Sequence, residues 1–419
     1  MAAIRRRFIS ILCVCLLVSG CDFSLMPAAK IDAQWHRQQL LEGLLSHWLA
    51  VSPADNGYMA PSFARDWRPI PKNKPSTPLI LQARNIYGFA SGYEFSGDKR
   101  YLEAALRGAD FLLRYFHDPV YGGWYTEVAP DGRVVDDSKQ TYGHAFAIFA
   151  LAHVYRVAKD ERYREAALEG WRVLRGKMRD RLGGFQRSAS RRFDQADTIR
   201  TQNPVMHLFE AMLALSEATG SVEALAGAEG VGDFVLHMLL RQQRDGSAYI
   251  EEWYDENWQP LADDKGGYTD LGHQFEWAFL LSSAGLKGFP EIYAESAQKV
   301  MDYALKVGYD ESSGGSFFRV SSTGSVTQEK GYWEQSECLR VLMHFMVMRG
   351  KKSLRPRYEQ TLQYVADEWI DPLNGGWLMK PKRVCATADC PNEQPDVYHM
   401  TAMHREALEL AALQEKSSR

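Results

Sequence analysis

Apolar residues along most of this chain recur with the period of an amphipathic helix. In GDKRYLEAALRGADFLLRYF and KDERYREAALEGWRVLRGKM they fall at positions i, i+3, i+4 and i+7, and Asp98 and Asp160 stand where an N-cap is expected. Two sets of helices are predicted from this pattern. The outer set carries most of the exposed charge and lies near 31–50, 99–116, 160–178, 221–242, 290–307 and 354–370, and the inner set, apolar on all faces, lies near 81–95, 141–157, 203–218, 271–285, 332–349 and 398–414.

Glycine motifs repeat in the segments between the helices, four as Gly-Gly pairs and one as a weaker Asp-Gly copy. Their last glycines, Gly123, Gly184, Gly246, Gly315 and Gly376, are 61, 62, 69 and 61 residues apart. A regular period of this length indicates repeated supersecondary units. Six outer helices alternating with six inner helices predict an all-α chain folded as an (α/α)6 barrel, in a single domain over residues 31–416.

The connections between the predicted helices are of two kinds. Short links join each inner helix to the next outer helix, while long segments rich in Gly, Trp and Asp join each outer helix to the next inner helix. The long loops therefore gather at the end of the barrel where the inner helices begin. Functional residues are expected at this end, because loops carried on a rigid scaffold commonly form the functional site.

The first twenty residues differ from this pattern. Three arginines at 5–7 precede an apolar run from Phe8 to Val18, which has about half the length of a membrane-spanning helix. This arrangement predicts a secretion signal over residues 1–20. The rest of the chain, with 45% hydrophobic and 24% charged residues overall, has the composition of a globular protein that buries a large core.

The end of this signal, VSGC, resembles a bacterial lipobox. Cys21 is therefore predicted to carry a lipid that anchors the protein to the membrane, with residues 21–30 as a tether and the barrel in the periplasm. Asp22 resembles the signal that retains lipoproteins in the inner membrane of enteric bacteria. The alternative is an ordinary cleaved signal in which Cys21 is incidental.

Removal of the signal changes the formal net charge from −4 to −7, because residues 1–20 hold three arginines and no acidic residue. An acidic chain without a long Lys/Arg run argues against a nucleic-acid partner, since phosphate binding needs concentrated positive charge. Beyond Cys21 the mature chain holds three cysteines. Cys385 and Cys390 are close enough in sequence to close a disulfide loop in an oxidising compartment, and Cys338 would remain free.

Polar and aromatic residues that are unusual for a packed helix stand at the start of each predicted inner helix. They are Arg84 and Tyr87 in RNIYGF, His144 in YGHAF, Asn203 and His207 in NPVMHLFEA, His273 and Glu276 in GHQFEW, Trp333 and Glu337 in GYWEQSE, and Tyr398 and His399 in PDVYH. In a ring of helices these side chains converge at one mouth. Six independent segments with such residues at the same level indicate an active site more strongly than any single motif.

Two of the histidines have a glutamate three residues later, His207 with Glu210 and His273 with Glu276. This spacing places a carboxylate beside an imidazole on one helix face. The carboxylate is expected to orient the imidazole and raise its pKa toward neutrality, which suits a general acid or base. The same two pairs could also form a metal site, which we expect less, so no metal is predicted.

A lone histidine on an apolar helix is more often a hydrogen-bonded core residue than a catalyst. Histidines at the start of the third, fourth and sixth inner helices reverse that expectation for His207, His273 and His399. For His144 a pocket-lining role and a structural role remain equally open. Glu337 is expected either to orient a neighbour or to satisfy a buried donor.

In these motifs the chain resembles the N-acylglucosamine 2-epimerase family, which includes cellobiose 2-epimerases and bacterial mannose isomerases. R-x-x-Y-x-F, M-H-L-x-E-A, G-H-x-x-E-W, W-x-Q-x-E and Y-H occur in family order over residues 31–415. The resemblance implies that His273 and His399 are the two acid–base groups and that His207 assists them. It further implies that Arg84 and Glu276 contact the sugar oxygens and orient the bases and that Trp333 packs over the sugar ring. Further candidates for binding the substrate are Tyr87, His144, Asn203 and Glu337.

The activity implied by this resemblance is cofactor-independent epimerisation at C2 of an aldose, or aldose–ketose isomerisation. After the sugar ring opens, one histidine removes the C2 proton and a cis-enediol(ate) forms. Return of a proton to C2 from the opposite face gives the C2 epimer, whereas protonation of C1 gives a ketose. Arg84 would stabilise the negative oxygen charge that develops.

Two other classes of function fit the predicted barrel. A glycoside hydrolase or lyase would need two carboxylates across the scissile bond, and Asp136, Asp137 and Asp270 are available on loops, but none of them forms so clear a pair as the histidines. The other class is a glycan-binding lipoprotein without catalytic activity. The presence of both His273 and His399 favours an enzyme.

Overall fold

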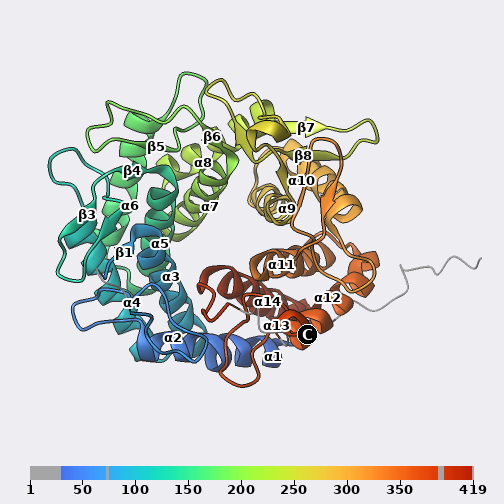
Figure 1. Ribbon diagram of the computed structural model, residues 1–419, viewed down its shortest axis with the longest axis horizontal. Helices are drawn as coiled ribbons and strands as arrows, with labels where there is room; N and C mark the ends of the chain where they lie inside the picture. The colour runs from blue at the N-terminus through green and yellow to red at the C-terminus, as the bar shows by residue number, and fades with distance from the viewer. Residues whose placement is uncertain (1–29, 72–74, 386–390, 418–419) are drawn as a thin grey trace, which may run out of the picture.

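Helices form a closed ring in the computed structural model, which describes residues 30–71, 75–385 and 391–417 (Figure 1). The fold is an (α/α)6 barrel, as predicted, and each inner helix begins and ends within three residues of its predicted bounds. These helices are almost entirely buried, which explains why their sequences are apolar on every face. They are α3 (Leu79–Ser96), α5 (Thr141–Ala158), α7 (Gln202–Thr219), α9 (Leu271–Leu286), α11 (Tyr332–Met348) and α14 (Tyr398–Ser417).

The outer helices surround this ring. Asp98 and Asp160 accept hydrogen bonds from the backbone N–H groups of Arg100 and Arg162, so both predicted N-caps are confirmed. Four outer helices each run into a π-helical turn: α4 (Lys99–Phe111) with η3 (Leu112–Phe116), α6 (Glu161–Val173) with η4 (Leu174–Met178), α8 (Val222–Phe234) with η5 (Val235–Leu239), and α10 (Glu291–Tyr303) with η7 (Ala304–Gly308). The other two are α12 (Arg355–Glu368), preceded by the short η8 (Lys352–Leu354), and the segment formed by α1 (Ala33–Gln38), η2 (Gln39–Leu45) and α2 (Ser46–Val51).

Short antiparallel strands stiffen the long loops. They are β1 (Thr77–Pro78), β2 (Glu127–Val128), β3 (Val134–Asp136), β4 (Lys139–Gln140), β5 (Ser188–Ala189), β6 (Arg200–Thr201), β7 (Leu240–Gln242), β8 (Ala248–Ile250), β9 (Trp253–Tyr254), β10 (Thr269–Asp270), β11 (Arg319–Val320) and β12 (Val326–Thr327), with the helical turns η6 (Asp263–Lys265) and α13 (Lys382–Cys385). The fourth outer helix was predicted to continue to residue 242. It ends at Leu239 because residues 240–242 pair with β8 instead.

The glycine repeat marks the turn that follows an outer helix. Gly123 has a φ of +69°, and a Cβ atom there would lie 2.5 Å from His144 Nε2, so only glycine fits the position. Five residues earlier, Asp118 is buried and forms an ion pair of 3.0 Å with Lys139. Corresponding aspartates pair with a basic side chain in three other loops, as Asp180 with Arg200, Asp310 with Lys330 and Asp371 with Arg65.

The ring closes where the first and last helices meet. Helix α14 contacts α1, α3 and α11. Nδ1 of His36 on α1 lies 2.9 Å from Nδ1 of His404 on α14, and both side chains are fully buried. One imidazole donates and the other accepts, so the two rings cannot both be protonated to imidazolium ions without losing this bond. Burial lowers the pKa of His36 to about 3 and lowers the pKa of His404 well below its ordinary value.

We expect this histidine pair to make the fold acid-sensitive. A folded-state pKa below that of the unfolded chain stabilises the protein above about pH 6.5, and this stabilisation is lost as the pH falls toward the folded-state value. By pH 5 the loss for His36 is about 2 kcal/mol in the free energy of unfolding. Urea unfolding at several pH values measures it. A variant with both His36→Leu and His404→Leu should show a flatter pH dependence, whereas His237→Leu, at an exposed histidine, should keep the parent's slope.

Among residues 30–71, 75–385 and 391–417, no helix is long and apolar enough to span a membrane. The predicted secretion signal, Cys21 and most of its tether lie outside the described residues, as does Cys390. Cys338 is buried in α11 as a free thiol.

Candidate active site

The inner helices begin directly after short strands or loop caps, and this geometry fixes their first residues. Asp270 ends β10, and its side chain accepts a hydrogen bond of 3.1 Å from the backbone N–H of His273. Thr201 ends β6, and its hydroxyl accepts a hydrogen bond from the backbone N–H of Asn203. Both contacts are N-caps of an inner helix, and they hold the first helical turn at the end of the barrel that carries the long loops. We call this the loop end.

A carboxylate from a neighbouring loop orients His273. Nδ1 of His273 lies 2.7 Å from Oε2 of Glu252, which stands between β8 and β9. Gln202 donates to the same carboxylate oxygen at 2.8 Å, and Trp277 donates to the Gln202 carbonyl at 2.6 Å, so the orientation of this amide is set. Burial alone would lower the pKa of His273, but the charges of Glu252 and Asp270 outweigh it and raise the pKa to about 10. His273 is therefore an imidazolium at neutral pH.

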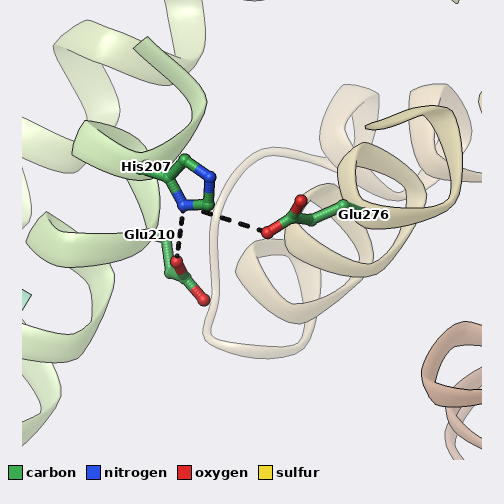
Figure 2. A group of neighbouring side chains, drawn as sticks. All are labelled: His207, Glu210 and Glu276. Atoms are coloured by element: carbon green, nitrogen blue, oxygen red, sulfur yellow. Dashed lines mark hydrogen bonds and ion pairs between the residues drawn. The ribbon is translucent and has the colours of Figure 1, made fainter. Parts of the chain in front are cut away.

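The predicted pairing of His273 with Glu276 is wrong. The partner of His273 is Glu252, because Glu276 points from α9 toward α7 and lies 3.9 Å from Nδ1 of His207 (Figure 2). Both carboxylate oxygens of Glu276 are buried without a hydrogen-bond partner among the described residues. Burial, together with the nearby charges of Glu337 and Glu210, raises the pKa of Glu276 well above its ordinary value. The acid form of Glu276 is therefore favoured relative to that of a free glutamate.

His399 is oriented in the same way as His273 but has the opposite charge state. Its Nδ1 lies 2.8 Å from Oε1 of Glu337, whose other oxygen accepts from Arg340 at 3.2 Å. Burial lowers the pKa of His399, and Glu337 offsets this effect only in part because Arg84 opposes it. His399 is neutral at neutral pH. The expected orienting role of Glu337 thus has a direct geometric basis.

His207 forms the pair that its spacing predicts. Its Nδ1 lies 3.1 Å from Oε2 of Glu210, and the hydroxyl of Tyr398 donates to the same carboxylate. The expected rise of its pKa is wrong. Burial dominates over the attraction of Glu210 and lowers the pKa of His207 to about 4.

Trp333 brings the two predicted acid–base histidines into one site. The centroid of its ring is 4.9 Å from that of His273 and 5.2 Å from that of His399, so the two imidazoles lie within about 10 Å of each other. Both histidines retain slight exposure, 7% for His273 and 6% for His399. Since each Nδ1 faces a carboxylate, each Nε2 is the nitrogen available to a ligand.

Arg84 lies on the other side of His399. It forms an ion pair of 2.9 Å with Asp396 and donates to the hydroxyl of Tyr142 at 2.9 Å. Its guanidinium lies 4.4 Å from the centroid of the Phe146 ring. Its Nε–H is buried without a hydrogen-bond partner among the described residues, as is the side-chain oxygen of Asn203. Both unpartnered groups are candidates for binding an oxygen-rich ligand.

Two predicted site residues are not part of this group. His144 uses both ring nitrogens for the loop backbone, at 2.8 Å to the carbonyl of Gln140 and 2.9 Å from the N–H of Trp124, so we reassign it to positioning that loop. Tyr87 lies deeper in the barrel. It lines a cavity of about 140 Å³ with His153 and Arg405, toward the ends of the inner helices.

Several residues of the site were missed by sequence reasoning. Glu252 and Asp396 lie on loops and carry no periodic signal, so nothing in the sequence connects them with His273 and Arg84. Arg340 was detectable, because it stands three residues after Glu337 on the same helix face. Glu334 was also missed. Burial raises its pKa to about 8, and the charge of Asp270 raises it in the same direction.

Two sets of side chains have donor atoms close enough to hold a cation. In each of them the three donor atoms lie within 4.8 Å of one another, in His207, Glu210 and Glu276 (Figure 2) and in Glu276, Glu337 and His399. Both sets share Glu276, whose raised pKa disfavours the ionised form that would bind a metal ion. Arg340 already places a positive charge near Glu210 and Glu337.

Three buried histidine–carboxylate pairs at the loop end of an (α/α)6 barrel form a candidate acid–base site in a protein of that fold class. The family model for N-acylglucosamine 2-epimerase (GlcNAc 2-epimerase) matches residues 57–403. The chain therefore belongs to the N-acylglucosamine 2-epimerase family and is an epimerase or isomerase of sugars.

Named relatives support this assignment. The chain is 25% identical over 366 residues to a cellobiose 2-epimerase from Eubacterium cellulosolvens, covering 81% of this chain and 88% of the relative. It is 28% identical over 333 residues to a mannose-6-phosphate isomerase from Rhizobium meliloti, covering 76% of this chain and 82% of the relative.

Solved structures share the fold. The structure of cellobiose 2-epimerase from Spirochaeta thermophila superposes with a TM-score of 0.81 at 20% identity, covering 91% of this chain and 97% of that chain. A D-mannose isomerase superposes with a TM-score of 0.80 at 20% identity, covering 92% and 99%. An α-mannanase of Bacteroides thetaiotaomicron has a lower TM-score of 0.61 at 11% identity, covering 93% and 98%, so the same barrel also carries hydrolysis.

Proposed function

We propose that this protein is a carbohydrate 2-epimerase or aldose–ketose isomerase that moves a proton at C2 of an aldose between His273 and His399. The observation that carries the proposal is that both histidines contact the ring of Trp333, at 4.9 and 5.2 Å between ring centroids, and that each has a carboxylate at Nδ1. An enzyme that inverts C2 needs one acid–base group on each face of that carbon. The opposite charge states of the two imidazoles supply one acid and one base at the same pH.

The charge states assign the first step. Neutral His399 removes the C2 proton of the open-chain aldose, and the electron pair of that C–H bond forms the C1–C2 double bond while the carbonyl oxygen takes up negative charge. Protonated His273 then returns a proton to C2 from the other face, which yields the epimer. In the reverse reaction the two histidines exchange roles. Delivery of the proton to C1 instead gives a ketose.

The surrounding residues position the substrate and stabilise charge. The unpartnered Nε–H of Arg84 is available to the oxygen that becomes negative, a preorganised electrostatic contribution. Trp333 offers an aromatic face beside both histidines for a sugar ring. The raised pKa of Glu276 disfavours a further negative charge beside Glu210 and Glu337. The chemistry of these residues requires no metal or organic cofactor.

One experiment tests the reaction class. The purified protein is incubated in D2O with mannose, glucose, cellobiose and N-acetylmannosamine, before and after treatment with EDTA, and C2 is followed by NMR. We expect deuterium to enter C2 of at least one sugar as its epimer or ketose appears, with or without EDTA. New reducing ends without C2 exchange would identify a hydrolase, and activity that depends on an added divalent ion would overturn the metal-free mechanism.

We expect Glu252→Gln to move the alkaline limb of the pH–rate profile. The parent loses kcat/KM as the pH falls through the lowered pKa of His399 and as it rises through the pKa of His273, about 10. Without the Glu252 charge, burial lowers the pKa of His273, so the alkaline limb should move down by about 1–3 pH units. Profiles of kcat/KM between pH 5 and pH 11 measure this shift.

The neighbouring Glu251→Gln is the matched control. Glu251 accepts a hydrogen bond from Thr269 rather than from a histidine. The pH–rate profile of the Glu251→Gln variant should therefore match that of the parent. If the Glu252→Gln profile also coincided with the parent's, the charge of Glu252 would have no role in holding the proton on His273.

We also propose that the chain is exported to the periplasm and anchored by a lipid at Cys21. This proposal rests on the arginines, the apolar run and the VSGC sequence before residue 22.

A further inference from the structure

The described chain begins at the end of the barrel that lies opposite the candidate active site. Inner helices end and outer helices begin here, and we call this the rear face. The backbone N–H of Ile31 donates to the side chain of Gln414 near the end of α14. Lys30, Lys352 and Leu413 line one groove there. Lys30, the first described residue, therefore lies on the rear face.

Exposed apolar side chains are concentrated on this face. Among the described residues, eight large apolar side chains are exposed. Five of them lie in or beside the short rear links or at the end of α14. Val222 is 81% exposed as the first residue of α8, and Ile292 is 46% exposed in the first turn of α10. The other three rear residues are Leu225, Leu286 and Leu413. Exposed apolar side chains at these helix ends do not pack within the barrel. Such a concentration is typical of an interaction surface.

Positive charge lies on the same face. The link between α11 and α12 reads Arg349-Gly-Lys-Lys-Ser-Leu-Arg355 and holds no acidic residue, although the whole chain has a net charge of −4. Lys351 is exposed, Lys352 is half-buried, and neither forms an ion pair within residues 30–71, 75–385 and 391–417. Lys30 lines the same groove as Lys352. A face that carries both exposed apolar side chains and lysines suits the interface of an anionic bilayer, because the apolar side chains enter the acyl boundary while the lysines meet headgroup phosphates.

We propose that the rear face docks on an anionic phospholipid membrane, with the links before α8 and α10 at the bilayer interface and the active site directed away from it. A lipid at Cys21 would favour this orientation, because the nine residues 22–30 span at most ~30 Å even when fully extended. The docking surface itself consists of described residues and acts whether or not the anchor is present. It is also independent of the reaction that the barrel catalyses.

Vesicle binding without the anchor tests this surface. Every described helix follows Lys30, so a chain that begins at Asp22 keeps the complete barrel. We expect it to sediment with vesicles of phosphatidylethanolamine and phosphatidylglycerol, less so at high salt, and not with vesicles of phosphatidylcholine alone. Each removed lysine should weaken binding about fivefold, so Lys351→Glu with Lys352→Glu should weaken it at least tenfold. Val222→Ser with Ile292→Ser should also weaken it.

The matched control reverses two charges at the loop end, with Lys265→Glu and Lys380→Glu, both at exposed positions. This variant should bind vesicles as the parent does, and all variants should retain sugar turnover, which reports that the barrel is folded. Equal binding by the parent and the rear-face variants would overturn the proposal, as would weaker binding by the loop-end variant alone. The parent could instead fail to bind vesicles and form a dimer that the Val222→Ser and Ile292→Ser variant disrupts. That outcome would identify the rear face as an interface between copies of the chain.

Discussion

His273→Asn and His399→Asn should each lower the kcat for net epimerisation or isomerisation by about 10²–10⁴-fold, because each removes one of the two proton-transferring groups. The two variants should differ in deuterium exchange. A variant with one remaining histidine can still remove and return the C2 proton on that face, so it should exchange C2 of one epimer while forming almost none of the other. NMR in D2O, started separately from each epimer, measures both effects.

His237→Asn is the control for these substitutions. His237 is exposed on η5 and bonds only to the carbonyl of Asp233, so its replacement should leave turnover unchanged. If His273→Asn and His399→Asn both lost exchange from the same epimer and kept it from the other, the two histidines would not serve opposite faces of C2. Full activity in either variant would remove that histidine from the mechanism.

Arg340→Met should cause the largest loss of stability, about 3–5 kcal/mol in the free energy of unfolding. Arg340 is buried, pairs with Glu337 at 3.2 Å and Glu210 at 3.8 Å, and lies over the ring of Phe279 at 3.7 Å. Its removal leaves two buried carboxylates without their cation, beside Glu276. Urea midpoints of the parent and the variant, measured at the same pH, give the difference.

Two further variants separate the charge effect from simple loss of packing. Arg133→Met, at an exposed arginine on a loop, should change the free energy of unfolding by less than about 0.5 kcal/mol. Adding Glu337→Gln to Arg340→Met removes one uncompensated charge and should recover part of the loss. An Arg340→Met protein as stable as the parent would show that the carboxylates near Arg340 adapt by taking up protons.

Docking of the rear face would fix the orientation of the active site relative to the membrane. With the links before α8 and α10 on the bilayer, the loop end that holds His273 and His399 opens away from the membrane. A soluble sugar would then reach the active site without crossing the lipid surface. Export, the lipid at Cys21 and membrane docking remain separate proposals, since the vesicle experiment addresses the barrel surface alone.

The helices were predictable because their signal is local. Each inner helix contributes about eighteen consecutive residues to a buried wall, so its apolar pattern and its bounds can be read without knowledge of its neighbours. The level of the site was predictable for the same reason. His207, His273, Trp333 and His399 all stand in the first turns of inner helices, and closure of the ring brings those turns together.

The pairing between side chains was not predictable in the same way. Glu252 replaced Glu276 as the partner of His273, since a loop that returns over the barrel places its carboxylate closer than the helical neighbour does. His144 has the same apolar helical context as His207, and only its contacts with Gln140 and Trp124 distinguish a structural histidine from a site histidine.

The sequence by itself determined the alternation of helices, the repeat, the loop end as the place of the site and the residues that converge there, because these follow from local periodicity and chain order. Tertiary structure alone decided the charge of each histidine. The pKa of a buried imidazole depends on the balance between its desolvation and the carboxylates that reach it. That balance raises the pKa of His273 to about 10 and lowers the pKa of His399, although both carry a carboxylate at Nδ1.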